Sequence, residues 1–362
     1  MNRLVFIGAM LGSFVTVHAS TEVTCWRVGV PVVPSTEQNV SYTISGELCA
    51  TPAELVPGAT VQLLIHGATF NYDYWDFVRM DGLEYSYARD VAQRGIATFA
   101  YDALGSGSSS HPPSDRLTLQ AAARVAHQIV QCLRNGGIGG VQFGKVIPVG
   151  HSLGSVVVWQ EAITYGDVDG LIVTGAAHSL TTRFLNANPF YPASNDPAFS
   201  GMGLDAGYLT TTPGIRASLF YNDPQSDPVG ILSNEALKDV VPAIALTTGL
   251  PFVTSTATLA INVPVLTILG SADLLTCGAN TQGAVFDCSS AAVVVAQEAP
   301  FYSRQTAVGA CVIPDSGHNI SLSQNRHLQV EDAVAWSNAF VNQVAGYVPA
   351  NCRYYKENPN DL

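Results

Sequence analysis

Positive charge is scarce in this 362-residue chain. Lys and Arg together number 16 against 28 Asp and Glu, the net charge is −12, and only 12% of residues are charged. Proteins that bind nucleic acids or anionic membranes do so mainly through clustered Lys and Arg. Because no basic cluster occurs here, the composition argues against both kinds of partner and suits a soluble extracellular protein.

Apolar runs that could span a bilayer, which takes about 20 residues, are also missing. Residues 1–19 contain one Arg, a shorter apolar run from Leu4 to Val17, and the sequence Val17-His18-Ala19 before Ser20. This order predicts a secretory signal peptide rather than a membrane anchor. We therefore expect a secreted protein without a membrane anchor after cleavage.

Cysteine pairs with the CxxC spacing of zinc and thioredoxin sites are absent, so no metal site of this kind is predicted. Behind a signal peptide, the seven cysteines are expected to form disulfides, with one thiol left over. Six cysteines allow many pairings that the sequence does not distinguish. Cys132 lies in a helical pattern and is the candidate for the free thiol, and proximity and elimination favour the pairs Cys25–Cys49, Cys277–Cys288 and Cys311–Cys352.

Apolar runs and helical patterns alternate along the remaining chain. Strands are predicted at Val28–Val33, Val40–Leu48, Thr60–Ile65, Ile96–Tyr101, Val146–Val149, Leu171–Thr174, Val265–Leu269 and Val308–Ile313. Helices are predicted at Leu83–Arg94, Leu117–Arg134, Ser155–Tyr165 and Glu331–Val344. This alternation predicts an α/β fold with a doubly wound, mostly parallel sheet.

Residues 178–262 break the alternation. The segment is rich in Pro, Gly, Thr and aromatic residues, and a structureless loop of this length is improbable in a compact domain. We expect a mostly helical cap here, inserted into an α/β core formed by residues 20–177 and 263–362.

The pentapeptide Gly150-His151-Ser152-Leu153-Gly154 stands between an apolar strand and a helical pattern. A Ser on so sharp a turn has a strained backbone, so small residues are needed two positions before and after it. The helix that follows directs its free N–H groups toward the place where negative charge would develop. The pattern predicts Ser152 as a nucleophile.

Activation of a Ser requires a His base and a carboxylate that orients the His. Asp273 follows one predicted strand and His318 follows the last one, so both are expected at the sheet edge where α/β proteins bind ligands. Asp315 is a rival for Asp273, but its closeness to His318 favours a role in capping a turn.

Tetrahedral intermediates also need two backbone N–H donors for the oxyanion. Leu153 offers one, and Ala68, in the sequence His66-Gly67-Ala68-Thr69 after a strand, offers the other. Asp102-Ala103-Leu104-Gly105-Ser106-Gly107-Ser108-Ser109 is similar to the turn D-x-x-G-x-G-x-S. Together and in this order, these signals resemble those of α/β-hydrolases of the esterase/lipase type.

The resemblance implies the α/β-hydrolase fold, a cap after the sixth strand, and the triad Ser152, Asp273 and His318. It also implies a hydrolase of carboxylic esters or lactones that forms an acyl-enzyme and needs no cofactor. Ser at position 152 disfavours relatives with an Asp nucleophile. The HGGG motif of one lipase branch is missing, so Ala68 is assigned by position only. Cofactor-free perhydrolases, hydroxynitrile lyases and a non-catalytic binding protein are the alternatives.

Aromatic residues and scarce charge in the expected cap favour a compact, hydrophobic small-molecule substrate. For each cap aromatic the competing interpretation is packing in the core. His151 and His178 border the site without a second ligand at metal spacing. The candidate pocket residues are Thr69, Tyr72, Trp75, His178, Tyr208, Phe220 and Tyr221.

Overall fold

The structure is a computed structural model that describes residues 22–35, 40–222, 226–346 and 351–355. The expected signal peptide, residues 1–19, lies outside these residues. Among the described helices, none combines the length and the apolar character needed to cross a membrane.

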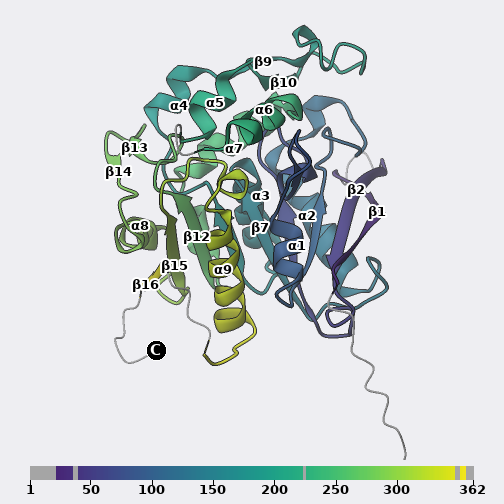
Figure 1. Ribbon diagram of the computed structural model, residues 1–362, viewed down its shortest axis with the longest axis vertical. Coiled ribbons are helices and arrows are strands. Elements are labelled where there is room, and N and C mark those ends of the chain that lie inside the picture. The colour runs from purple at the N-terminus through teal and green to yellow at the C-terminus, as the bar shows by residue number, and fades with distance from the viewer. Residues whose placement is uncertain (1–21, 36–39, 223–225, 347–350, 356–362) are drawn as a thin grey trace, which may run out of the picture.

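A twisted sheet forms the centre of the molecule (Figure 1). Within the described residues it has nine strands, in the spatial order β1 (Thr24–Val32), β2 (Tyr42–Ala50), β6 (Ala97–Tyr101), β3 (Thr60–Ile65), β7 (Lys145–His151), β8 (Leu171–Thr174), β12 (Val265–Gly270), β15 (Val308–Ile313) and β16 (Cys352–Tyr355). The strands from β6 to β15 are parallel, and β1, β2 and β16 pair antiparallel at the two edges. The expected α/β fold with a mostly parallel sheet is confirmed.

Helices cover both faces of this sheet, as they must when the central strands are almost entirely apolar. The helices α2 (Leu119–Arg134), α3 (Leu153–Tyr165) and α8 (Ala291–Glu298) pack on one face, and α1 (Tyr87–Ala92) and α9 (Arg326–Trp336) on the other. The side chain of Thr118 accepts a hydrogen bond from Ala121 N and so begins α2. Gly166, with φ 61°, ends α3 in the left-handed region that favours glycine.

Two predicted elements differ from the structure, and one strand of the central sheet was not predicted. Residues 84–86 form β5 (Glu84–Ser86), a hairpin with β4 (Asp76–Val78), and only the following residues are helical. The closing helix begins at Arg326, before the expected start, and its last part is a π-helix over residues 337–341. The edge strand β16 was not predicted, because four residues with a single clear apolar position carry little strand signal.

Three disulfides connect the pairs that proximity and elimination favour. Cys25–Cys49 and Cys311–Cys352 each join two residues that face one another on neighbouring antiparallel strands. Cys277–Cys288 closes a loop after β12 that contains two short strands, β13 (Gly278–Ala279) and β14 (Val285–Phe286). Cys132 is free and partly buried, and burial raises the pKa of its thiol.

The segment 178–262 lies above one end of the sheet in Figure 1. It contains four helices, α4 (Thr182–Ala187), α5 (Ile215–Phe220), α6 (Pro228–Ala236) and α7 (Ala243–Val253), in its described part. It also contains a small antiparallel sheet that the sequence did not predict, formed by β9 (Phe190–Pro192), β10 (Tyr208–Thr211) and β11 (Val241–Pro242). The segment is therefore helical with a short sheet.

Candidate active site

Ser152 lies on the turn between β7 and α3. Its φ of 53° and ψ of −118° lie outside the regions that ordinary residues favour, which is the strained turn that the sequence predicts. Any side chain at the two flanking glycines would clash. A Cβ on Gly150 would come within 2.4 Å of Ser155 Cα, and one on Gly154 within 2.2 Å of Ile65 O. The glycines therefore allow the helix to start this close to the sheet.

His318 and Asp273 come from the loops after β15 and β12. His318 Nδ1 lies 2.9 Å from Asp273 Oδ2, and both side chains are almost completely buried. Asp273 Oδ1 accepts a hydrogen bond from Leu275 N at 2.9 Å. Asp315 is exposed and its backbone N–H donates to Ser271 Oγ. Asp273 is thus the carboxylate that contacts His318, and Asp315 belongs to the neighbouring turn.

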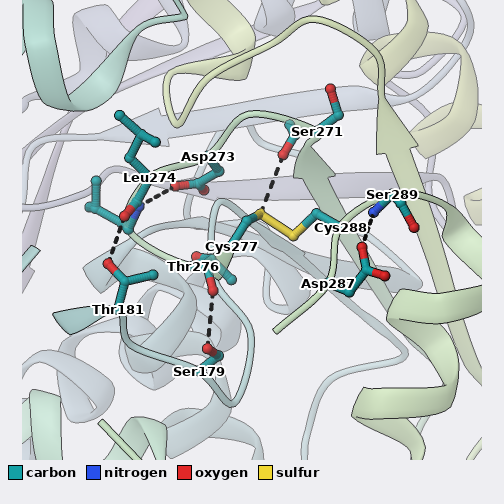
Figure 2. Close-up of a disulfide and its surroundings, with 12 residues drawn as sticks. Ser179, Thr181, Ser271, Asp273, Leu274, Thr276, Cys277, Asp287, Cys288 and Ser289 are labelled. Carbon is teal, nitrogen blue, oxygen red and sulfur yellow. Dashed lines mark hydrogen bonds between the residues drawn. A yellow bond between two sulfur atoms is a disulfide. The ribbon is translucent and has the colours of Figure 1, made fainter. Parts of the chain in front are cut away.

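The two loops can approach because a glycine stands where they meet. A Cβ on Gly270 would lie 2.3 Å from the carbonyl oxygens of both Ser316 and Gly317. The Cys277–Cys288 disulfide lies beside Asp273 (Figure 2), and Cys277 N donates to Asp273 O at 2.8 Å. Figure 2 also shows Ser179 and Thr181 bonded to the carbonyls of Thr276 and Leu274. The loop that carries Asp273 is therefore held from several sides.

The loop after β3 runs past Ser152. A Cβ on Gly67 would lie 3.0 Å from Ser152 Cβ, so a larger residue there would crowd the nucleophile. His66 fixes the loop, because its Nδ1 contacts Gly67 O at 2.8 Å and its Nε2 accepts from Ala103 N at 3.0 Å. Ala68 and Leu153 both line the cavity that contains Ser152.

The expected turn at residues 102–109 is hydrogen-bonded to the chain that follows the loop after β3. Asp102 accepts hydrogen bonds from Tyr72 N and Ser108 N, both at 2.8 Å, and Ser109 Oγ donates to Asp102 O at 2.6 Å. The aspartate therefore connects the turn to the chain that leaves the Ala68 loop.

Arg216, on α5, is a residue of this region that the sequence analysis missed. It is completely buried, and its Nη1 donates to Thr69 Oγ1 at 2.9 Å and to Thr69 O at 3.2 Å. Its Nε donates to Asn234 Oδ1 at 3.0 Å, and the guanidinium lies 4.2 Å from the centre of the Phe70 ring. Thr69 itself has a φ of 60°. Arg216 thus holds the residue after Ala68 in an uncommon backbone conformation.

The Arg216 guanidinium has no carboxylate within ion-pair distance among the described residues. Burial lowers its pKa to about 10, and the negative charges of more distant groups act in the opposite direction. The side chain therefore keeps its charge at neutral pH. No periodic pattern or motif in the sequence indicates this role.

A cavity lies between the segment 178–262 and the side chains of Ser152 and His318. Ser152 and His318 both line it, and no charged carboxylate, Lys or Arg does so among the described residues. The apolar side chains of its wall are Ala68, Phe70, Leu153, Val156, Ala176, Ala177, Leu180, Phe184, Phe190, Phe220, Leu246, Leu250, Val253 and Leu275. A second apolar cavity shares Ala68 and Leu153 with the first and extends toward α2.

Of the seven candidate pocket residues, only Phe220 lines the cavity next to Ser152. The other six lie elsewhere: Thr69 beneath Arg216, Tyr72 under the guanidinium of Arg27, Trp75 in the core against Tyr87, His178 against Glu298, Tyr208 bonded to Pro112 O, and Tyr221 buried behind Phe220. The same aromatic residue types occur in the core and in the pocket, so the sequence did not show which aromatic side chains line the cavity.

His151 precedes the Ser and lies behind the His318 ring, with ring centres 4.7 Å apart. Its own ring stacks on Tyr74 at 4.1 Å. Burial, together with the nearby His318, holds the pKa of His151 well below its usual range. His151 is therefore neutral and packs behind the His318 ring without lining the cavity.

Comparisons with known proteins agree with this architecture. The chain matches the alpha/beta hydrolase family over residues 62–333. Among solved structures, it is similar to a thermophilic esterase from Thermogutta terrifontis, with a TM-score of 0.57, 17% identity, and coverage of 87% of this chain and 99% of that one. No curated protein matches the chain.

Two further solved structures show the same fold at low identity. The monoacylglycerol lipase of Paleococcus ferrophilus has a TM-score of 0.53 and 15% identity, and covers 83% of this chain and 100% of its own. The esterase of Exiguobacterium antarcticum has a TM-score of 0.53 and 15% identity, with coverage of 85% and 99%. With the family match spanning most of the described chain, the protein belongs to the alpha/beta hydrolase family.

Proposed function

We propose that the protein is a serine hydrolase that cleaves carboxylic esters or lactones of small hydrophobic compounds. The observation that supports this best is the His318–Asp273 pair at 2.9 Å, with the His318 ring on the same apolar cavity wall as Ser152. A nucleophile, a base and an orienting carboxylate are the groups that acyl transfer requires.

In the proposed reaction, Ser152 Oγ attacks the ester carbonyl carbon and its proton passes to His318 Nε2. Asp273 keeps the proton of His318 on Nδ1 and stabilises the imidazolium that forms. Collapse of the tetrahedral intermediate breaks the ester C–O bond, and His318 returns the proton to the leaving alcohol. Water then attacks the acyl-enzyme by the same route, which releases the acid and restores Ser152.

The N–H groups of Ala68 and Leu153 are the proposed donors to the oxyanion. Both residues line the cavity, and Leu153 begins α3, where unpaired N–H groups and the helix dipole favour negative charge. Arg216 acts in this scheme as a positioning residue, because it holds Thr69 by two hydrogen bonds directly after Ala68.

We assign the segment 178–262 as the cap of the enzyme. Phe184, Phe190 and Phe220, together with three residues of α7, cover the cavity from this segment. A neutral, mainly apolar wall favours uncharged acyl or aromatic groups, and a cover excludes water and limits substrate size. The proposed substrates are therefore compact esters or lactones rather than long triglycerides, peptides or sugars. Three disulfides are compatible with the proposed secretion.

A fluorophosphonate probe and p-nitrophenyl esters test this function. We expect the probe to label Ser152 and the esters to give a burst of product, and Ser152→Ala to abolish both while the circular dichroism spectrum is unchanged. Ser200→Ala is the matched control, because Ser200 is exposed in the segment 178–262, does not line the cavity, and donates to Pro197 O. Labelling that survives Ser152→Ala, or equal rates on short esters and emulsified triolein, would contradict the proposal.

A further inference from the structure

A second group of polar side chains is buried between α2 and α3, away from the triad. His127 on α2, Glu161 on α3 and Asp167 in the loop after α3 each offer one ligand atom, and these atoms all lie within 4.8 Å of one another. The residues are far apart in sequence and lie on three elements, so no spacing pattern indicates them. Nothing in the proposed hydrolytic reaction uses them.

Four polar atoms of this cluster have no hydrogen-bond partner among the described residues. His127 Nδ1, both carboxylate oxygens of Glu161 and Asp167 Oδ1 are buried and have no hydrogen-bond partner within the described part of the chain. His127 Nδ1 does lie 2.8 Å from Asp167 Oδ2, but this contact does not have the direction of a hydrogen bond. Burying such atoms unpaired costs about 1–3 kcal/mol each, and more if they are charged. Four of them in one place indicate a missing common partner.

Glu161 carries most of this cost. Its side chain is completely buried. His127 and Asp167, in contrast, have side chains 26% and 20% exposed. The cluster is thus open to solvent on the side of His127 and Asp167 and closed behind Glu161, so a small ion could enter from the surface.

We propose that His127, Glu161 and Asp167 bind one divalent transition-metal ion. Two carboxylates supply the two negative charges that balance such an ion, and the imidazole favours zinc or a neighbouring first-row metal over calcium or magnesium. Gln131 Nε2 donates to Asp167 Oδ2, and the His127 ring stacks on Tyr165 at 3.9 Å. Such contacts orient ligands around a metal.

The ion would join the end of α3 to α2 and to the loop that leads into β8. Glu161 lies nine residues after Ser152 on the same helix, which is about 13 Å along the helix axis. The metal is therefore too distant to contact substrate, and its role is structural. It would fix the helix that begins at the nucleophile.

Metal content and thermal unfolding test the proposal in the mature protein purified without a histidine tag and with its disulfides intact. After zinc loading and exhaustive dialysis, elemental analysis should give about one zinc per chain, and Tm should fall when EDTA removes it. Glu161→Gln and His127→Gln should lose the bound zinc and the response of Tm. His327→Gln is the control, because His327 is exposed on α9, and it should keep both.

Cobalt(II) binding can be measured on the wild-type protein alone, so this test does not require any variant to fold. Wild-type protein titrated with cobalt should develop visible d–d absorption that saturates near one equivalent and is displaced by zinc. Wild-type protein that retains no zinc and shows no change of Tm or spectrum would overturn the proposal, and the two carboxyl groups would then share a proton. Equal zinc binding by Glu161→Gln would overturn it as well.

Discussion

Two buried His–carboxylate pairs in the described residues have the same geometry and different surroundings. His318 Nδ1 lies 2.9 Å from Asp273, and His178 Nδ1 lies 2.9 Å from Glu298. The second ring nitrogen of His178 contacts Thr258 Oγ1 at 2.8 Å, and its ring is stacked between Trp159 and Phe301. The ring of His318 instead lines the cavity with Ser152.

The comparison shows that a His–carboxylate pair is not in itself a sign of catalysis. Both carboxylates orient an imidazole, but a base must also present its free nitrogen to a reacting group. Both ring nitrogens of His178 contact buried groups of the protein, so neither is free to act on a substrate. We therefore expect the two regions to respond differently to the same chemical change.

Asp273→Asn should have the largest effect. The amide keeps the shape of the side chain but favours the wrong tautomer of His318, and in a serine protease this change lowers kcat by about 10⁴. Turnover of a p-nitrophenyl ester and a chemical unfolding curve measure activity and folding separately. Asp315→Asn is the control and should keep most of the activity. If the losses were reversed, the assignment of the carboxylate would be wrong.

Arg216→Met should have the second largest effect. The variant tests whether the buried charge beside Thr69 is needed for activity. Met keeps the length of the side chain but releases Thr69, so we expect kcat to fall about tenfold to a hundredfold with little change in KM, less than the loss of one oxyanion donor. Stability should change little, because the removal of a buried charge without an ion pair offsets the loss of the hydrogen bonds to Thr69 and Asn234. Arg216→Lys should recover part of the activity. A fall in Tm that parallels the fall in kcat would indicate a purely structural role.

Glu298→Gln should change stability and leave activity almost intact. The substitution is the counterpart of Asp273→Asn in the His178 region and weakens hydrogen bonds to His178 N and Nδ1, at 2.8 and 2.9 Å. A charge-assisted hydrogen bond of this kind contributes about 1.5–3 kcal/mol. Urea unfolding should register this loss, while kcat stays within a few-fold of wild type. An activity loss as large as that of Asp273→Asn would remove the distinction between the two pairs.

Phe220→Ala should have the smallest effect and should alter selectivity. Phe220 lines the cavity, and its ring centre is 5.5 Å from that of His318. Its removal enlarges the acyl space, so we expect the preferred chain length to increase by a few carbons with a modest change in the best kcat/KM. The measurement is a series of p-nitrophenyl esters, with Phe199→Ala as a control because Phe199 is buried away from the cavity. An unchanged preference would show that Phe220 does not contact the substrate.

The sequence identified the strands and the triad candidates because their signals are local. Ser152, Asp273 and His318 each follow an apolar run, and the strands at residues 60–65, 171–174 and 308–313 have the predicted bounds. Pocket residues have no such signal. Trp75 and Phe220 are both large and apolar, and only the three-dimensional contacts separate a core residue from a cavity wall.

Contacts between residues on distant elements could not be predicted from the sequence either. Arg216 meets Thr69 over 147 positions, and His178 meets Glu298 over 120. Neither pair belongs to a periodic pattern or a motif, so the sequence did not indicate which residues contact each other. The small sheet of β9, β10 and β11 was missed for a related reason, because strands of two to four residues carry too few positions to show alternation.

The Cys277–Cys288 bond also affects how this protein can be prepared. Cys277 lies four residues after Asp273 and donates its N–H to the Asp273 carbonyl, so the bond ties the loop of the orienting carboxylate to the chain before α8. In a reducing bacterial cytoplasm this tie does not form. Material from such a host would also lack the two disulfides at the sheet edges. We therefore expect a low specific activity there to report on the oxidation state of the preparation rather than on the choice of substrate.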